Sequence, residues 1–311
     1  MNIVVTGAAG FIGSNLVKSL ALKGYRVIAI DALIDTTYSK EIKSKKWESL
    51  REFRNVELVH TDLREGNIEN VISGSDLIFH LAAMPGLVDS WSNFDLYSSC
   101  NISATQRILA SLVNLDQRPK LIHISTSSVY GKIASGDEED VTNPYSPYGV
   151  TKLAAENLLK AYASNYEFDF NILRYFSVYG PDQRPDMAYS KFISAIHYGD
   201  EILLHGDGKQ SRTNTYVSDC VDATIAVAEK GNSNVIYNIA GIEEIDMLSV
   251  IRFLENIMKK KAKVVRKSTR NGDQLVTRGN IKRLQNDTGF HPKIGLYQGL
   301  QNQVEAFYKH L

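Results

Sequence analysis

Short apolar runs alternate with helical patterns over the first 180 residues, and this alternation restricts the fold more than any other feature of the chain. The helical patterns are clearest at residues 11–23, 102–114 and 150–165. Apolar strands separated by helices indicate a parallel sheet that helices cover on both faces. We therefore predict an α/β fold with a doubly wound sheet, whose ligands bind beyond the carboxyl ends of the strands. The strands are expected at residues 2–6, 25–30, 56–60, 76–82, 120–125 and 170–175.

After about residue 178 the loops lengthen and turn residues cluster, which indicates a second, smaller unit. We predict a first domain over residues 1–177 and a C-terminal α/β lobe over 178–311, with the chain returning to the first domain around 215–240. The glycine-containing segment 205–211 is expected to be a hairpin turn. Further strands are expected at 201–205, 235–239 and 263–267, and further helices at 187–198, 219–230, 246–259, 280–287 and 296–309.

Charge and cysteine content exclude several classes of protein. The 35 basic and 35 acidic residues give zero formal net charge, so we expect no nucleic-acid or membrane partner. Cys100 and Cys220 form no CxxC pair, and no apolar run approaches the length of a membrane span. The first residues already read as a strand, with no leader pattern, so we expect a cytoplasmic protein. The histidine spacing predicts no metal site. The lysine-rich helical segment 39–53 is expected to be a solvated face anchored by Trp47.

A glycine-rich turn follows the first strand and predicts a dinucleotide site in a Rossmann-type sheet. Gly7 permits a tight turn, Gly10 lets a pyrophosphate approach the helix N-terminus, and Gly13 permits close packing of helix and strand. Asp31 ends the next strand, where its carboxylate would accept hydrogen bonds from the adenosine ribose. The same carboxylate would repel a 2′-phosphate, so we expect NAD rather than NADP.

Residues at the ends of the third and fourth strands extend this predicted cofactor site. Asp62 and Leu63 would place a carboxylate near the adenine, although Asp62 at this position equally fits a helix N-cap. Small residues after the fourth strand would let the backbone lie along the cofactor, whereas His80 reads as a strand-end histidine rather than a catalyst. The residues after the fourth strand that would line the cofactor are Leu81, Ala82 and Ala83.

Tyr148 and Lys152 are four residues apart in a predicted helix, so both point to one face. An ammonium beside a phenol favours the phenolate, which makes Tyr148 a candidate general base for removing a hydroxyl proton.

The chain resembles the extended short-chain dehydrogenase/reductase family. The likeness rests on this tyrosine–lysine pair, the glycine turn and the segments STSSVYG (125–131) and LRYFSVYGP (173–181). The likeness is to its NAD-dependent nucleotide-sugar epimerases, above all UDP-glucuronate 4-epimerases, through YGPDQRPDMA (179–188). It further implies cofactor contacts from Phe11, Ile12, Asn101, Tyr148, Lys152 and Tyr175.

The resemblance implies a transient oxidation at the sugar C4. Thr126 would relay the 4-OH proton to Tyr148, the C4 hydride would pass to NAD, and the hydride would return to the other face of the 4-keto sugar. Family 4,6-dehydratases carry Asp-Glu where this chain has Ser127 and Ser128. Two serines are poor acids and bases, so the sequence argues against dehydration.

The resemblance also implies a UDP-sugar site in the C-terminal lobe. Arg212 would contact the diphosphate, and Arg270 with Asp273 would hold ribose and phosphate. Arg184 would lie near a sugar carboxylate, although a surface ion pair remains the alternative, while Ser127 and Ser177 would add room and donors. The chain departs from the uronate pattern at Gly86-Leu87-Val88 and at Thr213-Asn214.

Several alternatives stay open at this level. The leading hypothesis is a UDP-glucuronate 4-epimerase, followed by a UDP-glucose or UDP-N-acetylglucosamine 4-epimerase and then a nucleotide-sugar 4,6-dehydratase. A non-catalytic NAD-binding protein on the same fold is the hypothesis from another class, and the intact Thr126, Tyr148 and Lys152 argue against it. By analogy with the family we expect a homodimer that pairs through helices at 93–114 and 146–166.

Overall fold

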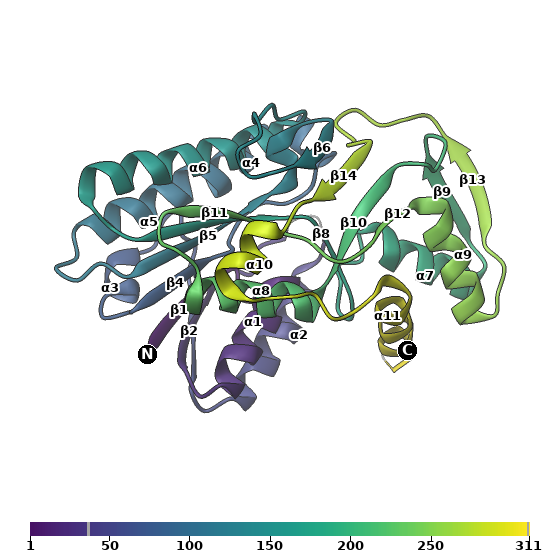
Figure 1. The fold of residues 1–311 in the computed structure, drawn as a ribbon. Coiled ribbons are helices and arrows are strands. Elements are labelled where there is room, and N and C mark those ends of the chain that lie inside the picture. Colours follow the sequence, from purple (N-terminus) through teal and green to yellow (C-terminus); the bar gives the residue numbers. More distant parts are fainter. Residues whose placement is uncertain (36–37, 310) are drawn as a thin grey trace.

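The computed structural model describes residues 1–35, 38–309 and 311, and in this part of the chain it contains one seven-stranded parallel sheet (Figure 1). Its strands are β1 (Asn2–Thr6), β2 (Arg26–Asp31), β3 (Val56–His60), β4 (Leu77–His80), β5 (Lys120–Thr126), β7 (Phe170–Tyr175) and β11 (Val235–Ile239). Their spatial order is β11-β7-β5-β4-β1-β2-β3, so the order reverses beside β1. The predicted doubly wound sheet is confirmed, and its crevice for ligands lies at this reversal.

Successive side chains of β1 point into two different cores, which explains why the strand is apolar without alternation. Val4 packs with Ile30 and Ile78 in one core, and Ile3 and Val5 pack in the other. Burial on both faces requires apolar side chains at every position. The first core lies under α3 (Ile68–Ile72), α5 (Ala104–Val113) and α6 (Pro147–Tyr166), and the second under α1 (Phe11–Leu22), α8 (Val217–Lys230) and α10 (Lys282–Thr288) (Figure 1).

The C-terminal lobe is assembled from several short segments. A small sheet runs in the order β12-β10-β14-β6, with β8 beside β10. Its strands are β6 (Ile133–Gly136), β8 (Ser177–Tyr179), β10 (Ser211–Tyr216), β12 (Glu244–Asp246) and β14 (Val276–Gly279). A separate core forms between α7 (Ala188–Tyr198), α9 (Met247–Met258) and α11 (Leu296–Lys309). Because β6 of the N-terminal half pairs with β14, the two halves share a strand ladder.

The prediction of a hairpin at 205–211 is wrong. The segment joins β9 (Glu201–His205) to β10, but β9 pairs with β13 (Lys263–Lys267) and β10 lies in the small sheet. Gly206 and Gly208 both have positive φ, so the glycines still serve a turn. The turn redirects the chain between two sheets, which local turn chemistry does not distinguish from a hairpin.

The lysine-rich segment forms α2 (Lys40–Ser49) and a short 3₁₀ turn, and the buried Trp47 anchors it as expected. The expectation of a solvated face is wrong for Lys43, whose side chain is buried and donates from Nζ to the Ile34 carbonyl oxygen at 2.6 Å. Before α5, α4 (Phe94–Ser98) and a π-helical stretch extend the helical pattern of 102–114 toward its N-terminus, which agrees with the helix expected at 93–114 by analogy.

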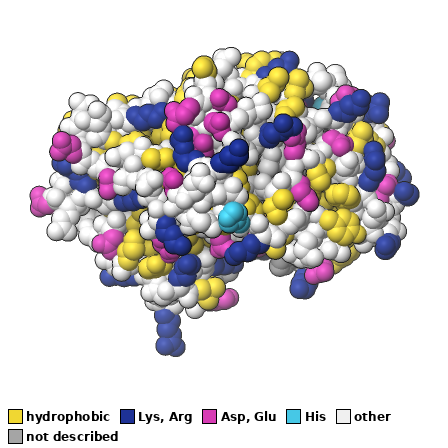
Figure 2. All heavy atoms as spheres, viewed as in Figure 1, with side chains coloured by type: hydrophobic (Ala, Val, Ile, Leu, Met, Phe, Trp, Pro, Cys, Tyr) yellow, Lys and Arg dark blue, Asp and Glu magenta, His cyan; other side chains and the backbone are white. Residues whose placement is uncertain are grey.

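Across the described part of the chain, no helix is long and apolar enough to cross a membrane. The face drawn in Figure 2 intersperses basic and acidic side chains, in keeping with the zero formal charge of the sequence.

Candidate active site

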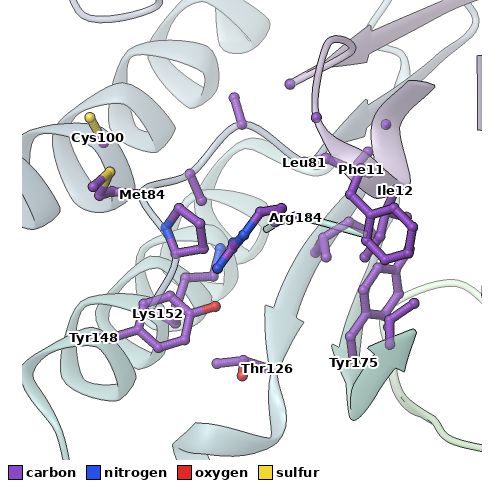
Figure 3. A pocket seen from close by; sticks show the side chains of 18 of the residues that line it. Phe11, Ile12, Leu81, Met84, Cys100, Thr126, Tyr148, Lys152, Tyr175 and Arg184 are labelled. Carbon is purple, nitrogen blue, oxygen red and sulfur yellow. The ribbon is translucent and has the colours of Figure 1, made fainter. Parts of the chain in front are cut away.

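A cavity of about 410 Å³ lies at the carboxyl ends of the main-sheet strands, between this sheet and the C-terminal lobe. It reaches from the glycine turn after β1 to Arg184 and Arg212 of the second half. Figure 3 shows part of this lining, with Phe11 and Ile12 of α1 and with Arg184. Most residues singled out in the sequence line it. They are Gly7, Gly10, Phe11, Ile12, Gly13, Asp31, Asp62, Leu63, Leu81, Ala82, Ala83, Thr126, Ser127, Tyr148, Lys152, Tyr175, Ser177, Arg184 and Arg212.

The glycine turn has the geometry that a pyrophosphate site requires. Gly7 has φ +72°, and a Cβ there would lie 2.8 Å from the Ala82 nitrogen. A Cβ on Gly13 would lie 2.1 Å from the Gly7 carbonyl oxygen, so only glycine permits this contact. At Gly10 a Cβ would meet a single neighbouring atom, the Gly7 oxygen, and otherwise project into open space beside the helix N-terminus. The turn therefore fits the diphosphate of a dinucleotide.

Asp31 stands at the end of β2 and is held by two backbone donors. Its Oδ2 accepts from the Ala9 nitrogen and its Oδ1 from the Leu33 nitrogen, both at 2.9 Å. Burial raises the pKa of this carboxyl, and the two backbone hydrogen bonds and the nearby Lys43 oppose the rise. The carboxylate is thus fixed at the position where a ribose would donate to it, and this part of the cavity fits NAD.

The alternative role of Asp62 as a helix cap is wrong. The next helix, α3, begins at Ile68 and is capped by Asn67, whose side chain accepts from the Asn70 nitrogen. Asp62 instead accepts from Nη2 of Arg64 at 2.6 Å, and this hydrogen bond is the main reason that its pKa is lowered. Asp62 and Leu63 both border the cavity at the cofactor end, where an adenine contact remains the prediction.

Tyr38 and Lys43 also line this end of the cavity, although no motif in the sequence marks them as site residues. The Lys43 ammonium lies 4.9 Å from the centre of the Tyr38 ring, and burial lowers its pKa. Their position depends on how the segment after β2 packs, with Lys43 donating to the Ile34 carbonyl oxygen, and no local motif indicates that.

The N-terminus of α6 brings the predicted catalytic residues together. The Ser146 side chain accepts from the Gly149 nitrogen at 3.1 Å, and Pro147 occupies the first turn, where a missing N–H costs nothing. A Cβ on Gly149 would lie 2.7 Å from the Ser128 carbonyl oxygen. This close approach sets Tyr148 against the hydroxyl-rich end of β5, which explains why the SPYG sequence carries a glycine.

Tyr148, Thr126 and Lys152 form one polar group at the floor of the cavity (Figure 3). Burial raises the pKa of Tyr148, while its hydrogen bond with Thr126 and the charge of Arg184 lower it. Burial lowers the pKa of Lys152 to about 8, opposed by the charge of Glu156. Such a phenol, with a hydroxyl partner and cations nearby, can accept a proton from an alcohol.

The serines after Thr126 form a short 3₁₀ turn whose backbone is fixed. Thr126 Oγ1 accepts from the Ser128 nitrogen at 3.1 Å and donates to Ser128 Oγ at 3.2 Å. Gln274, which no sequence motif marks as a site residue, donates to the Ser127 carbonyl oxygen at 3.3 Å and also lines the cavity. The C-terminal lobe therefore contacts this turn directly.

The predicted substrate residues divide into two groups. Ser127, Ser177 and Arg212 line the cavity. Burial lowers the pKa of Arg212, and the nearby charge of Asp273 opposes this effect. Arg270 is exposed, and neither it nor Asp273 contributes to the cavity lining.

Arg184 extends into the cavity toward Tyr148 and Lys152 (Figure 3). It also forms a bidentate ion pair with Asp186, with Nε donating to Oδ1 at 3.0 Å and Nη2 to Oδ2 at 2.8 Å. Arg184 therefore lines the cavity, as predicted, and also forms the ion pair that was the alternative interpretation.

Two further predicted or discounted residues lie behind the cavity wall. Asn101 is buried in the π-helical stretch, accepts from the Met84 nitrogen at 2.7 Å and donates to Thr151, so it orders the segment after β4 without lining the cavity. His80 is buried between Thr6 and Thr105, at 2.8 and 3.0 Å, and lies outside the cavity lining. No group of three or more metal-ligating side chains occurs among the residues that the structure describes.

The fold and this site define an NAD-dependent enzyme of the extended short-chain dehydrogenase/reductase type. The chain belongs to the NAD dependent epimerase/dehydratase family, whose pattern it matches over residues 3–240. It is 37% identical to the uncharacterized UDP-glucose epimerase YtcB of Bacillus subtilis over 98% of this chain and 97% of the relative. It is 32% identical to the UDP-glucuronate 4-epimerase of Thermodesulfobacterium geofontis over 97% and 94% of the two chains.

Solved structures agree with this membership. The crystal structure of UDP-glucuronic acid 4-epimerase from Bacillus cereus, in complex with UDP-glucuronic acid and NAD, superposes with a TM-score of 0.96 at 35% identity, covering all of both chains. The family membership and the Rossmann-type fold expected from the sequence are thereby confirmed.

Proposed function

We propose that the protein is an NAD-dependent UDP-sugar 4-epimerase and that UDP-glucuronate is its substrate. The proposal rests on one observation. Thr126, Tyr148 and the Arg184 guanidinium lie together in the cavity that also contains the dinucleotide turn. A base for a sugar hydroxyl and a cation for a sugar carboxylate are then available on one ligand. The full-length likeness to UDP-glucuronate 4-epimerases supports the same substrate class.

In the proposed mechanism Thr126 receives the sugar 4-OH proton and Tyr148 accepts it as the general base. Lys152 keeps positive charge beside the phenolate, which stabilises the form of Tyr148 that has lost its proton. NAD bound along the glycine turn would supply a hydride acceptor and donor at C4, so the reaction has no net redox change. Arg184 would hold the carboxylate of the 4-keto uronate in fixed geometry and so slow its decarboxylation.

We propose that residues 1–177 bind NAD and that residues 178–311 mainly bind the nucleotide sugar, as expected from the sequence. Arg212 would bind the diphosphate, with Ser127 and Ser177 toward the sugar. Arg270 and Asp273 would reach the ribose and phosphate only with a rearrangement of the turn before β14, since they lie outside the cavity lining.

A neutral UDP-hexose is the second candidate substrate. Val88, which replaces an arginine of the uronate pattern, is 46% exposed, and the relative YtcB is named for UDP-glucose. Dehydration is disfavoured because the acidic residues that line the cavity, within the described chain, are Asp31 and Asp62 at the cofactor end. Ser127 and Ser128 stand where a dehydratase needs an acid and a base.

The deciding experiment incubates the purified protein with UDP-glucuronate and NAD and follows the sugar by proton NMR. Conversion to UDP-galacturonate, without CO₂ release or net NADH, would support the proposal. Tyr148→Phe serves as the inactive control. An unchanged spectrum with UDP-glucuronate, together with turnover of UDP-glucose or UDP-N-acetylglucosamine, would overturn the uronate assignment and leave the 4-epimerase assignment intact.

We further propose a homodimer in the cytoplasm. Trp91, Phe94 and Val150 are 55%, 46% and 46% exposed, and they precede or belong to α4 and α6, through which pairing is expected by analogy. Light scattering after size exclusion tests the assembly, and Val150→Glu should shift it toward the monomer. The two free cysteines are compatible with a reducing compartment.

A further inference from the structure

A buried carboxylate lies one helical turn beyond the catalytic lysine. Glu156 follows Lys152 by four residues in α6, so both side chains project from one face of the helix. Lys152 is 3% exposed and Glu156 is fully buried. A buried carboxylate needs several partners to offset its loss of hydration.

Glu156 has such partners on two neighbouring strands. Ser125, at the end of β5, donates from Oγ to Oε1. Arg174 of β7 donates from Nε to Oε1 at 3.1 Å and from Nη2 to Oε2 at 2.8 Å. Ser125 directly precedes Thr126, so the carboxylate links α6 to the strand that carries the proposed proton relay.

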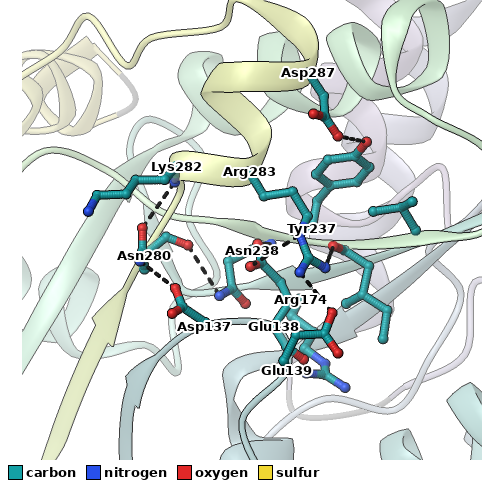
Figure 4. A network of polar contacts seen from close by, with 12 residues as sticks. Asp137, Glu138, Glu139, Arg174, Tyr237, Asn238, Asn280, Lys282, Arg283 and Asp287 are labelled. Atoms are coloured by element: carbon teal, nitrogen blue, oxygen red, sulfur yellow. Dashed lines mark hydrogen bonds and ion pairs between the residues drawn. The ribbon is translucent and has the colours of Figure 1, made fainter.

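Arg174 is itself held by two residues of the segment between β5 and α6 (Figure 4). Its Nη1 donates to the Glu138 carbonyl oxygen at 3.1 Å, and its guanidinium lies 4.8 Å from the centre of the Tyr130 ring. Tyr130 in turn donates to Asn238 Oδ1 at 2.8 Å. An arginine held at this many points gives Glu156 a single position.

We propose that Glu156 is a positioning residue, which from the same buried helix face favours the charged form of the Lys152 ammonium and so acts on Tyr148, while Ser125 and Arg174 hold Glu156. This inference rests on the proposed function, because it takes the Tyr148–Lys152 pair as catalytic.

The charges that face Lys152 come from four elements. Burial lowers the pKa of His80 of β4 to about 3 and that of His123 of β5 well below its usual range. The charge of Lys152 acts on both pKa values in the same direction. Both histidines are therefore neutral near pH 7. Tyr148 and Glu156 face it from α6, and Arg174 of β7 is paired with Glu156. Glu156 is the anion that opposes the effect of burial on Lys152.

The direct test is the titration of Lys152 in the protein without added substrate. Selective ¹⁵N-lysine labelling reports the Nζ shift, and Lys152→Met assigns the signal. We expect Glu156→Gln to lower the pKa of Lys152 by about one unit from its value of about 8. This readout does not depend on the substrate, so it separates failure of this inference from failure of the proposed function.

The activity test is a pH profile. With a pKa one unit lower, the charged fraction of Lys152 at pH 8 would fall from about one half to about one tenth, but would change little at pH 6.5. The ratio of kcat at pH 8 to kcat at pH 6.5 should therefore fall about fourfold in Glu156→Gln. Glu229→Gln, which removes a surface carboxylate paired with Lys23, is the matched control and should leave the ratio unchanged.

Two further variants keep the inference testable if the single variant does not fold. Glu156→Gln leaves Arg174 buried without its partner, so Glu156→Gln/Arg174→Gln removes both charges together. Ser125→Ala keeps both charges and should give a smaller shift in the same direction. A folded Glu156→Gln or double variant whose Lys152 titrates as in the wild type would overturn the proposal.

Discussion

Arg184 lies at the edge of the cavity while it holds Asp186 through two hydrogen bonds, at 3.0 and 2.8 Å. The arginine side chain is 15% exposed and the aspartate 26%. A bidentate pair of this kind fixes the plane of the guanidinium. Its Nη1 edge has no part in the pair with Asp186, and the positive charge acts on Tyr148 in the site.

Arg184→Met should change the preference between uronate and neutral sugars. Losing a charge-assisted contact costs about 2 kcal/mol, roughly 30-fold in kcat/KM for UDP-glucuronate. The variant also removes a charge that lowers the pKa of Tyr148, so turnover of both kinds of sugar should fall to some extent. The informative quantity is therefore the ratio of kcat/KM for UDP-glucuronate to that for UDP-glucose.

Asp186→Asn is the companion to this variant, because it keeps the arginine and weakens only its partner. We expect the sugar preference to change by less than about threefold, since a neutral amide can still accept from the guanidinium. If Arg184→Met lowered kcat/KM for UDP-glucuronate and for UDP-glucose by the same factor, the result would contradict a carboxylate-binding role.

Tyr148→Phe should lower kcat by roughly 10²- to 10⁴-fold, the range for losing a general base. The ring and its packing against Tyr97, at a centroid distance of 6.2 Å, remain in the variant. NAD binding, measured by calorimetry, should therefore stay within about threefold of the wild type. Tyr166→Phe removes a hydroxyl from an exposed tyrosine of the same helix and should leave kcat unchanged. Retention of more than a tenth of kcat in Tyr148→Phe would exclude this tyrosine as the base.

Gly13→Ala should weaken NAD binding at least tenfold and destabilise the fold by about 2 kcal/mol, because its Cβ would meet the Gly7 carbonyl oxygen at 2.1 Å. The contact is with backbone, so the turn itself must move. Gly24→Ala is the control, since a Cβ there meets no atom within 4 Å and strain arises only from φ +85°. Calorimetry should show normal NAD affinity for Gly24→Ala. Equal affinity in the two variants would argue against the glycine turn as the cofactor site.

The parts of the site that sequence predicts well are set by short-range geometry. The spacing of Gly7, Gly10 and Gly13 fixes a turn, and Tyr148 and Lys152 share a helix face whatever surrounds them. The unalternated apolar strands likewise indicate the parallel sheet, because a strand that is buried on both faces has apolar side chains at every position.

The parts that sequence did not predict depend on long-range packing. Tyr38 and Lys43 reach the cavity from the segment that follows β2, where Lys43 donates to the Ile34 carbonyl oxygen, and Gln274 reaches it from a lobe about 150 residues away in sequence. The hairpin expected at 205–211 failed for the same reason, since the partner of β9 is β13. Arg270 matched a family motif but lies on an exposed turn outside the cavity lining.

Lys152→Met should raise stability near pH 7 while it abolishes activity. Burial lowers the pKa of Lys152 from 10.5 to about 8, which amounts to about 3 kcal/mol of destabilisation wherever the lysine is charged in both the folded and unfolded states. Met fills a similar volume without a charge to desolvate. We expect urea unfolding at pH 7 to give a higher free energy of unfolding for the variant.

The pH dependence of that difference follows from the sign of the shift. Between pH 8 and 10.5 the unfolded state binds more protons at this lysine than the folded state, so wild-type stability gains with rising pH in this window. The stability advantage of Lys152→Met should therefore be full below about pH 8 and should shrink toward pH 10.5. Comparing the two proteins at each pH cancels the titration of the other tyrosines and lysines. A stability difference that does not change with pH would show that the gain comes from packing, and would contradict the lowered pKa of the buried lysine.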